Sequence, residues 1–214
     1  MVPTPPDDLR KILRAGFAEF LTAIKNCAQQ DLTTPAVILI YSLVDIAGWL
    51  DGKGPRATAK SFKDWANRYL LSGNPPLECN ADDLWNARCG VVHTMSPYSD
   101  RDRLRRIYYT TGDTSPQLLR EMGEVWASVQ AALHARGLRL PPPEDNHTVV
   151  RLEDLTAAAQ NATNQFLSEV ETDPERQHRM QAKAVRVFMK MEDQDLAERI
   201  AWGRNALRDH GTGA

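Results

Sequence analysis

The amino-acid sequence predicts an all-α protein, a helical bundle with additional helices at its C-terminal end. Apolar residues recur at spacings of three and four over most of the chain, which is the pattern of helices with one buried face. Prolines and glycines gather in short stretches between these periodic segments, as expected for turns. With 214 residues, of which 42% are hydrophobic, the chain is long enough to bury a substantial core.

Two helices open the predicted bundle. The first follows Asp7 and Asp8 and shows an apolar stripe at helical spacing, formed by Leu9, Ile12, Leu13, Phe17, Phe20, Leu21 and Ile24. A break at residues 31–35 separates it from a second segment, Ala36 to Leu50, which is apolar nearly all round. We expect this second segment to be the central, buried helix.

Two further helices complete the first part of the chain. A glycine-containing turn leads to an amphipathic segment over residues 58–71. After a loop with two prolines, Asn80 or Asp82 can cap a helix that runs to His93 and ends before Pro97. This last helix carries the residues on which the functional argument depends.

The second half of the chain is predicted to contain several kinds of element. Residues 101–111 fit a short strand or an extended loop, residues 116–136 form an amphipathic helix, and three consecutive prolines mark a linker. Three helical segments follow, over residues 152–170, 175–191 and 195–207. The expected organisation is a bundle over residues 7–137, a linker over 138–150 and a C-terminal helical segment over 151–209.

The sequence lacks the motifs of several common enzyme classes. It contains no P-loop, G-x-G-x-x-G, H-E-x-x-H or G-x-S-x-G pattern, and its five histidines and three cysteines show no metal-binding spacing. We therefore expect neither a metal nor a cofactor. A net charge of −2 argues against non-specific coating of nucleic acid. The start of the chain has no signal-peptide pattern and the most apolar segment is short for a membrane span, so we expect a cytoplasmic protein without membrane contact.

Arg88 and His93 are the residues that most suggest chemistry. Histidine titrates near neutrality, so it can take a proton from a ribose 2′-hydroxyl or give one to a departing 5′-oxygen. Arginine stays charged and can hold phosphate oxygens while negative charge grows on them. The pair suits metal-independent cleavage of RNA that leaves a 2′,3′-cyclic phosphate.

Arg88 and His93 do not share a face of an ideal helix. Residues five apart diverge by roughly 140° at about 100° per residue. They reach one phosphate if the arginine wraps round the helix, if Gly90 loosens the turn, or if a second subunit completes the pocket. We favour the second subunit, because two identical helices at a two-fold axis bring two Arg/His pairs together.

Two other polar residues are supporting candidates. Asp45 lies within the apolar central helix, where an unpaired carboxylate is costly, so it needs a partner such as Arg88 or His93. A structural pair with another arginine, or with tyrosine or tryptophan donors, explains Asp45 equally well. Asn86 can orient the arginine or bind substrate, although a surface amide is the commoner case.

A basic and aromatic segment follows the histidine. It offers phosphate contacts and a stacking surface for unpaired bases through Arg101, Arg103, Arg105, Arg106 and Tyr108, with Tyr109 as a second ring. The alternative interpretation is a solvated helical turn followed by two core tyrosines.

The stretch Leu84-Trp-Asn-Ala-Arg88-Cys-Gly-Val-Val-His93-Thr, with Asp45 in a preceding central helix, resembles the HEPN superfamily. The resemblance covers roughly residues 8–136. It implies an Arg-x4-6-His motif at Arg88 and His93, a dimer whose two motifs form one cleft, and metal-independent endoribonuclease activity of the kind found in toxin–antitoxin, abortive-infection and CRISPR-linked defence. Many catalytic members have a polar residue directly after the arginine, where this chain has Cys89.

The sequence thus favours a homodimeric endoribonuclease that acts on RNA, with an antitoxin or regulatory protein as a further expected partner. Two alternatives stay open. One is an inactive module of the same fold that binds a nucleotide, RNA or a protein, and the other is a helical scaffold in which the Arg/His pair is incidental.

Overall fold

A computed structural model describes residues 6–94, 106–112, 128, 132, 135–136 and 147–188. Helices dominate these residues, which confirms the predicted helical bundle. The helical elements are α1 (Pro6–Gln29), α2 (Thr33–Asp51), α3 (Ala59–Trp65), the π-helical η1 (Ala66–Leu70), α4 (Ala81–Thr94), α6 (Leu152–Glu171) and α7 (Pro174–Phe188). Two strands, β1 (Arg106–Thr110) and β2 (His147–Arg151), form a small sheet.

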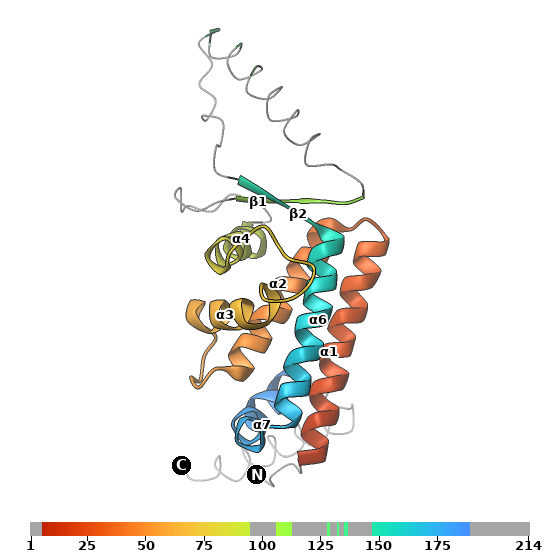
Figure 1. Cartoon of the computed structure of the whole chain (residues 1–214), viewed down its shortest axis with the longest axis vertical. Helices are drawn as coiled ribbons and strands as arrows, with labels where there is room; N and C mark the ends of the chain where they lie inside the picture. Colours follow the sequence, from red (N-terminus) through yellow and green to blue (C-terminus); the bar gives the residue numbers. More distant parts are fainter. Residues whose placement is uncertain are drawn as a thin grey trace, which may run out of the picture.

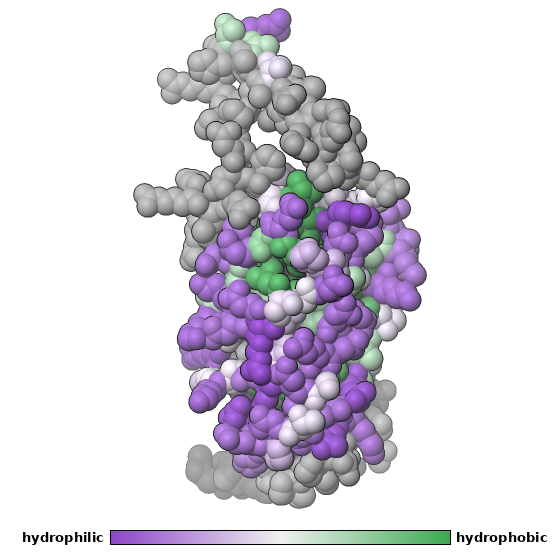
Figure 2. Space-filling view, viewed as in Figure 1, coloured by the Kyte–Doolittle hydropathy of each residue, from purple (hydrophilic) through white to green (hydrophobic). Residues whose placement is uncertain are grey.

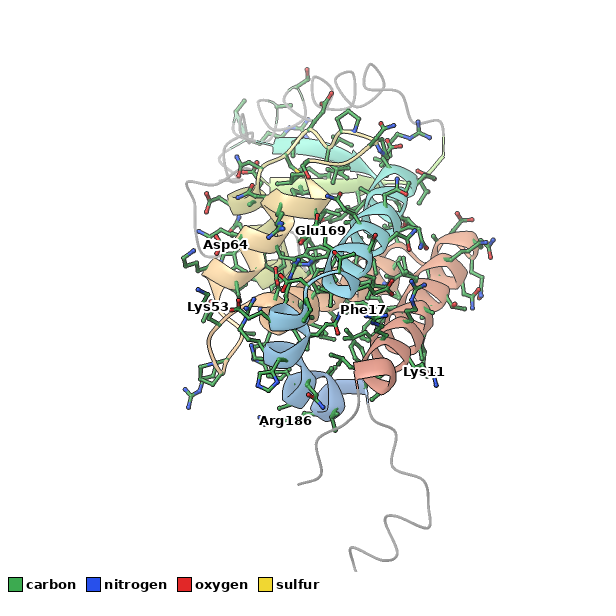
Figure 3. All side chains as sticks on the ribbon, turned by 60° about the horizontal axis from the view of Figure 1, so that its bottom comes forward. Lys11, Phe17, Lys53, Asp64, Glu169 and Arg186 are labelled. Carbon is green, nitrogen blue, oxygen red and sulfur yellow. The ribbon has the colours of Figure 1, made fainter. Side chains whose placement is uncertain are left out.

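The helices pack around α2. In Figure 1, α1 and α6 lie side by side along the long axis and run in opposite directions, with α7 near their lower end. Helices α3 and α4 contact α2 from the other side. Large side chains from three helices meet in the core, where Phe17 of α1 and Trp65 of α3 each place a ring within 5.8 Å of Phe166 of α6. Figure 3 shows Phe17 among the side chains that fill the space between the helices.

Helix α2 is the central helix that its composition predicts. Nine of its 19 residues are buried, and it contacts α1, α3, α4, α6 and α7. By length and composition it could cross a membrane, but half of its most apolar window is buried inside the protein, as in the core helix of a bundle. The polar surface fits this arrangement, since Figure 2 shows hydrophilic residues over most of the visible face and one group of hydrophobic residues towards the sheet end.

The sheet joins two segments that are distant in sequence. Its strands pair in parallel, with Ile107 opposite Thr148 and Tyr109 opposite Val150. Ile107 and Val150 are buried on the face that meets the helices, because alternate residues of a strand share one face. Of the two interpretations of residues 101–111, the structure shows a strand over Arg106–Thr110.

Strand β2 occupies residues that the sequence placed at the end of a proline-rich linker. The signal lay in Thr148, Val149 and Val150, which are β-branched and suit a pleated, half-buried surface. Thr148 also donates a hydrogen bond of 2.7 Å to the carbonyl of Glu78, which ties the strand to the loop before α4.

Helices α6 and α7 share the core with the first four helices. Both contact α1 and α2, and their buried residues belong to one hydrophobic cluster with those of α1 to α4. The division into a bundle over 7–137, a linker over 138–150 and a C-terminal segment over 151–209 stays a prediction about domains. Within the described range, the helices after β2 pack on the earlier ones.

A buried ion network fixes α7. Arg176 exposes 5% of its side chain and donates to Asp51 at the end of α2 (2.6 Å), to Glu169 of α6 (3.3 Å) and to the Tyr69 hydroxyl (2.5 Å). Tyr69 in turn donates to Glu169 at 2.7 Å, and burial is the main cause that raises the pKa of this tyrosine to about 12. Figure 3 labels Glu169 on α6, close to α7. The network thus gives the buried guanidinium hydrogen-bond acceptors from three elements, α2, α6 and η1.

Removing Asp51 should destabilise the fold strongly. Asp51→Ala leaves Arg176 buried with one carboxylate less, and we expect the free energy of unfolding to fall by about 3 kcal/mol. Urea unfolding followed by circular dichroism measures this. The control is Asp64→Ala, which breaks an exposed pair with Lys60 (62% and 83% exposed) and should cost less than about 1 kcal/mol. Equal losses in the two variants would contradict a special role for the network.

Gly48 allows α2 and α3 to cross closely. A Cβ atom at this position would lie 2.5 Å from the backbone oxygen of Ser61, which cannot rotate away. We expect Gly48→Ala to lower the free energy of unfolding by about 1–3 kcal/mol, as overpacking does, despite the better helix propensity of alanine. Gly54→Ala is the control, because a Cβ atom there would lie 4.0 Å from its nearest neighbouring atom. Thermal unfolding of both variants tests the difference.

Candidate functional site around Arg88

A reciprocal cap starts helix α4. The Asn80 side chain accepts hydrogen bonds from the backbone N–H groups of Asp82 (2.9 Å) and Asp83 (3.0 Å), while the Asp83 carboxylate accepts from the backbone N–H of Asn80 (3.0 Å). This arrangement satisfies amides that the first helical turn leaves unpaired. The sequence offered Asn80 or Asp82 as the cap, and the structure uses Asn80.

Arg88 of α4 pairs with Asp45 of α2. Both Nε and Nη2 of the guanidinium lie 2.7 Å from Oδ2 of the carboxylate. About a fifth of each side chain is exposed, 20% for Arg88 and 19% for Asp45, so the pair lies at the edge of the core and reaches solvent. The need of Asp45 for a partner follows from its place in an apolar helix, and Arg88 is one of the two partners expected from the sequence.

An aromatic ring supports the same guanidinium. The Cζ atom of Arg88 lies 5.2 Å from the centre of the Trp85 ring, within cation–π range. Trp85 packs edge-on against Phe62 of α3, with ring centres 5.3 Å apart. The guanidinium is therefore held between a carboxylate and an indole, which limits the orientations available to it.

His93 belongs to the same helix as Arg88. Helix α4 is continuous from Ala81 to Thr94, so Gly90 does not interrupt it. The divergence of roughly 140° between positions five apart thus applies to Arg88 and His93. The side chain of His93 lies outside the part of the chain that the structure describes.

Asn86 is buried, with 2% of its surface exposed, which rules out a surface amide. Residues two apart on an α-helix lie about 200° from each other, so Asn86 and Arg88 project from different sides of α4. The structure thus places Asn86 in the packed side of the helix.

The basic and aromatic segment is described only in part. Arg101, Arg103 and Arg105 lie outside the described residues, and Arg106 begins β1 with a side chain that is not described. Tyr108 is half-buried in β1 and makes contacts of its own.

Tyr109 has a role that the sequence did not reveal. Its hydroxyl shares a short hydrogen bond with the hydroxyl of Tyr41, a buried residue of α2. Burial raises the pKa of both tyrosines, so both are neutral near pH 7. Tyr109 is partly buried and lies on the same face of β1 as the buried Ile107, which favours the interpretation of a core tyrosine over that of a stacking surface. Recognising residues 106–110 as a strand would have given this result from alternation alone.

Metal-binding groups do not cluster among residues for which side chains are described: no three His, Cys, Asp or Glu side chains there are placed to hold an ion. The three cysteines, Cys27, Cys79 and Cys89, are free thiols and half-buried.

The chain matches no family model, no curated protein and no solved structure.

The strength of the Asp45–Arg88 pair can be measured. A double-mutant cycle with Asp45→Ala, Arg88→Ala and the double variant should give a coupling free energy of about 1–2 kcal/mol, between the values of exposed and of fully buried pairs. The matched control is a cycle on Lys63 and Asp82, a pair with 33% and 60% exposure, which should give less than about 1 kcal/mol. A coupling near zero for Asp45 and Arg88 would show that the pair does not hold the guanidinium in solution.

Proposed function

We propose that this protein is a metal-independent endoribonuclease that acts as a cytoplasmic homodimer. The observation that carries the proposal is the Arg88 guanidinium, held between Asp45 and Trp85 at a partly exposed position on the helix that also contains His93. Cleavage of RNA without a metal requires a fixed, solvent-reachable cation and a group that titrates near neutrality, brought together at one phosphate.

The proposed reaction is attack by a ribose 2′-hydroxyl on the adjacent phosphorus. His93 takes the 2′-hydroxyl proton or gives a proton to the departing 5′-oxygen, and Arg88 holds the non-bridging phosphate oxygens while their charge grows. The P–O5′ bond breaks as the O2′–P bond forms, which leaves a 2′,3′-cyclic phosphate and a 5′-hydroxyl. Orientation of Arg88 by Asp45 and Trp85 before substrate binds reduces the cost of reorganisation.

A second copy of the chain completes the site in this proposal. Positions 88 and 93 diverge on one continuous helix, so a neighbouring protomer is the simplest way to bring an arginine and a histidine to one phosphate. Helix α2, which carries Asp45, also has apolar residues that stay partly exposed, namely Ile38, Leu39 and Ile46. We propose that they contribute to the self-association surface.

The resemblance of residues 84–94 to the HEPN superfamily supports the same reaction. It also suggests a biological setting, a toxin–antitoxin or phage-defence system, in which an antitoxin or regulatory protein would hold the nuclease in check. Arg101, Arg103, Arg105, Arg106 and Tyr108 remain proposed RNA contacts in this scheme.

A second candidate function is RNA or nucleotide binding without cleavage. The observation in its favour is the Asp45–Arg88 pair itself, because a carboxylate at 2.7 Å offsets the charge that a phosphate would meet. Cys89 in place of a polar residue after the arginine points the same way.

Cleavage of RNA in the presence of EDTA separates these proposals. The purified protein, incubated with total RNA and EDTA, should release fragments that end in a cyclic phosphate, detectable by their resistance to 3′-end ligation until the phosphate is removed. His93→Ala and Arg88→Ala should each reduce cleavage by about 100-fold or more.

Matched controls come from residues of the same types outside the site. His178 is an exposed histidine of α7, and Arg14 pairs with Glu171 on the α1–α6 side of the molecule, so His178→Ala and Arg14→Ala should keep full activity. Retention of intact RNA that weakens with salt would favour the binding module. If the wild-type protein neither cleaves nor binds RNA, both proposals are rejected.

A further inference from the structure

A chain of aromatic contacts connects strand β1 to the Arg88 guanidinium. The Tyr109 hydroxyl bonds to that of Tyr41, whose ring centre lies 6.3 Å from that of Phe62. Phe62 contacts Trp85 at 5.3 Å, and the Trp85 ring carries the guanidinium of Arg88 at 5.2 Å. Each link is a side-chain contact between different elements or within α4, so a shift at one end is passed on through packed groups.

Tyr41 also lies beside the second group that holds Arg88. Tyr41 and Asp45 are four residues apart on α2 and therefore occupy the same face, one turn from each other. Tyr41 is thus a common neighbour of both supports of the guanidinium, the carboxylate through α2 and the indole through Phe62.

We propose that the Tyr41–Tyr109 hydroxyl pair is a positioning pair for Arg88. By tying β1 to α2, the pair holds α2 and the Phe62–Trp85 contact in the arrangement that orients the guanidinium. The consequence for catalysis rests on the proposed nuclease function, whereas the effect on the orientation of Arg88 does not.

The physical cost of breaking the pair explains why it can act in this way. Tyr41 is 1% exposed, so its hydroxyl has no access to bulk water as a replacement partner. Removing the Tyr109 hydroxyl alone leaves a buried polar group unsatisfied, and the surroundings shift to relieve it. Removing both hydroxyls breaks the link between β1 and α2 but leaves no buried hydroxyl unsatisfied. The double variant therefore distinguishes an effect on stability from an effect on the orientation of Arg88.

The first experiment measures the orientation of Arg88 without RNA. In ¹⁵N-resolved spectra, the Nε–H resonance of Arg88 should shift in Tyr109→Phe and in the double variant Tyr41→Phe/Tyr109→Phe, and its hydrogen exchange should become faster by several-fold. Arg14 is the internal control, because its Nε also bonds a carboxylate, that of Glu171 at 2.6 Å, and this pair joins α1 to α6. An Arg88 resonance that stays unchanged in both variants would overturn the proposal.

The second experiment measures cleavage of a short RNA. Tyr109→Phe should lower kcat about tenfold and leave KM nearly unchanged, since small displacements of a group that acts in the transition state reduce the rate steeply. The double variant should recover the stability lost in Tyr109→Phe but keep the low kcat. If kcat recovers together with stability, the pair is structural only and the proposal fails.

The two proposals fail in different ways. Absence of RNA cleavage by the wild-type protein rejects the nuclease function, and the Arg88 resonance then decides the positioning proposal by itself. Cleavage that depends on Arg88 and His93 but is unaffected by loss of both tyrosine hydroxyls supports the nuclease and rejects the positioning pair.

Discussion

Two carboxylates on the most apolar helix impose the main constraint on this fold. Helix α2 buries much of its surface, yet it carries Asp45 within its length and Asp51 at its end. Neither charge can be left alone in such a setting, so each must meet a cation from another element. Arg88 of α4 meets Asp45 and Arg176 of α7 meets Asp51, so each ion pair ties one further helix to α2.

The two pairs differ in a way that bears on function. Arg176 is 5% exposed and has two carboxylates and a tyrosine hydroxyl as acceptors, which leaves it enclosed in the fold. Arg88 is 20% exposed and is flanked by a ring that offers attraction without taking up its hydrogen-bond donors. The Arg88 side chain can therefore be reached from solvent, whereas Arg176 cannot be reached without opening the core.

The spacing of apolar residues predicts the helices, because each helix buries one apolar stripe. The stripe that contains Phe17 is an example. The sequence also predicts that Asp45 needs a partner, because an unpaired carboxylate in an apolar helix is costly in any protein. The sequence does not predict the pair of Asp51 with Arg176, because Asp51 reads as the first residue of a turn and Arg176 lies 125 positions away. Strand β2 was missed because a strand of five residues next to three prolines gives too short a pattern to distinguish it from a linker.

Tyr109 shows how the choice between a strand and a loop changes the interpretation of a site. If residues 106–110 were a loop, neighbouring tyrosines would be equivalent and both would be available to bases. In a strand they face opposite ways, so Tyr109 is used by the fold while Tyr108 lies on the other face. The parallel pairing with β2 adds that this strand is held from a distant part of the chain. The position of Arg88 therefore depends on more than its own helix: it depends on α2 through Asp45 and on β1 through Tyr41, Phe62 and Trp85. Arg88 and His93 lie within six positions of the sequence, but the contacts that hold Arg88 come from segments that only folding brings together.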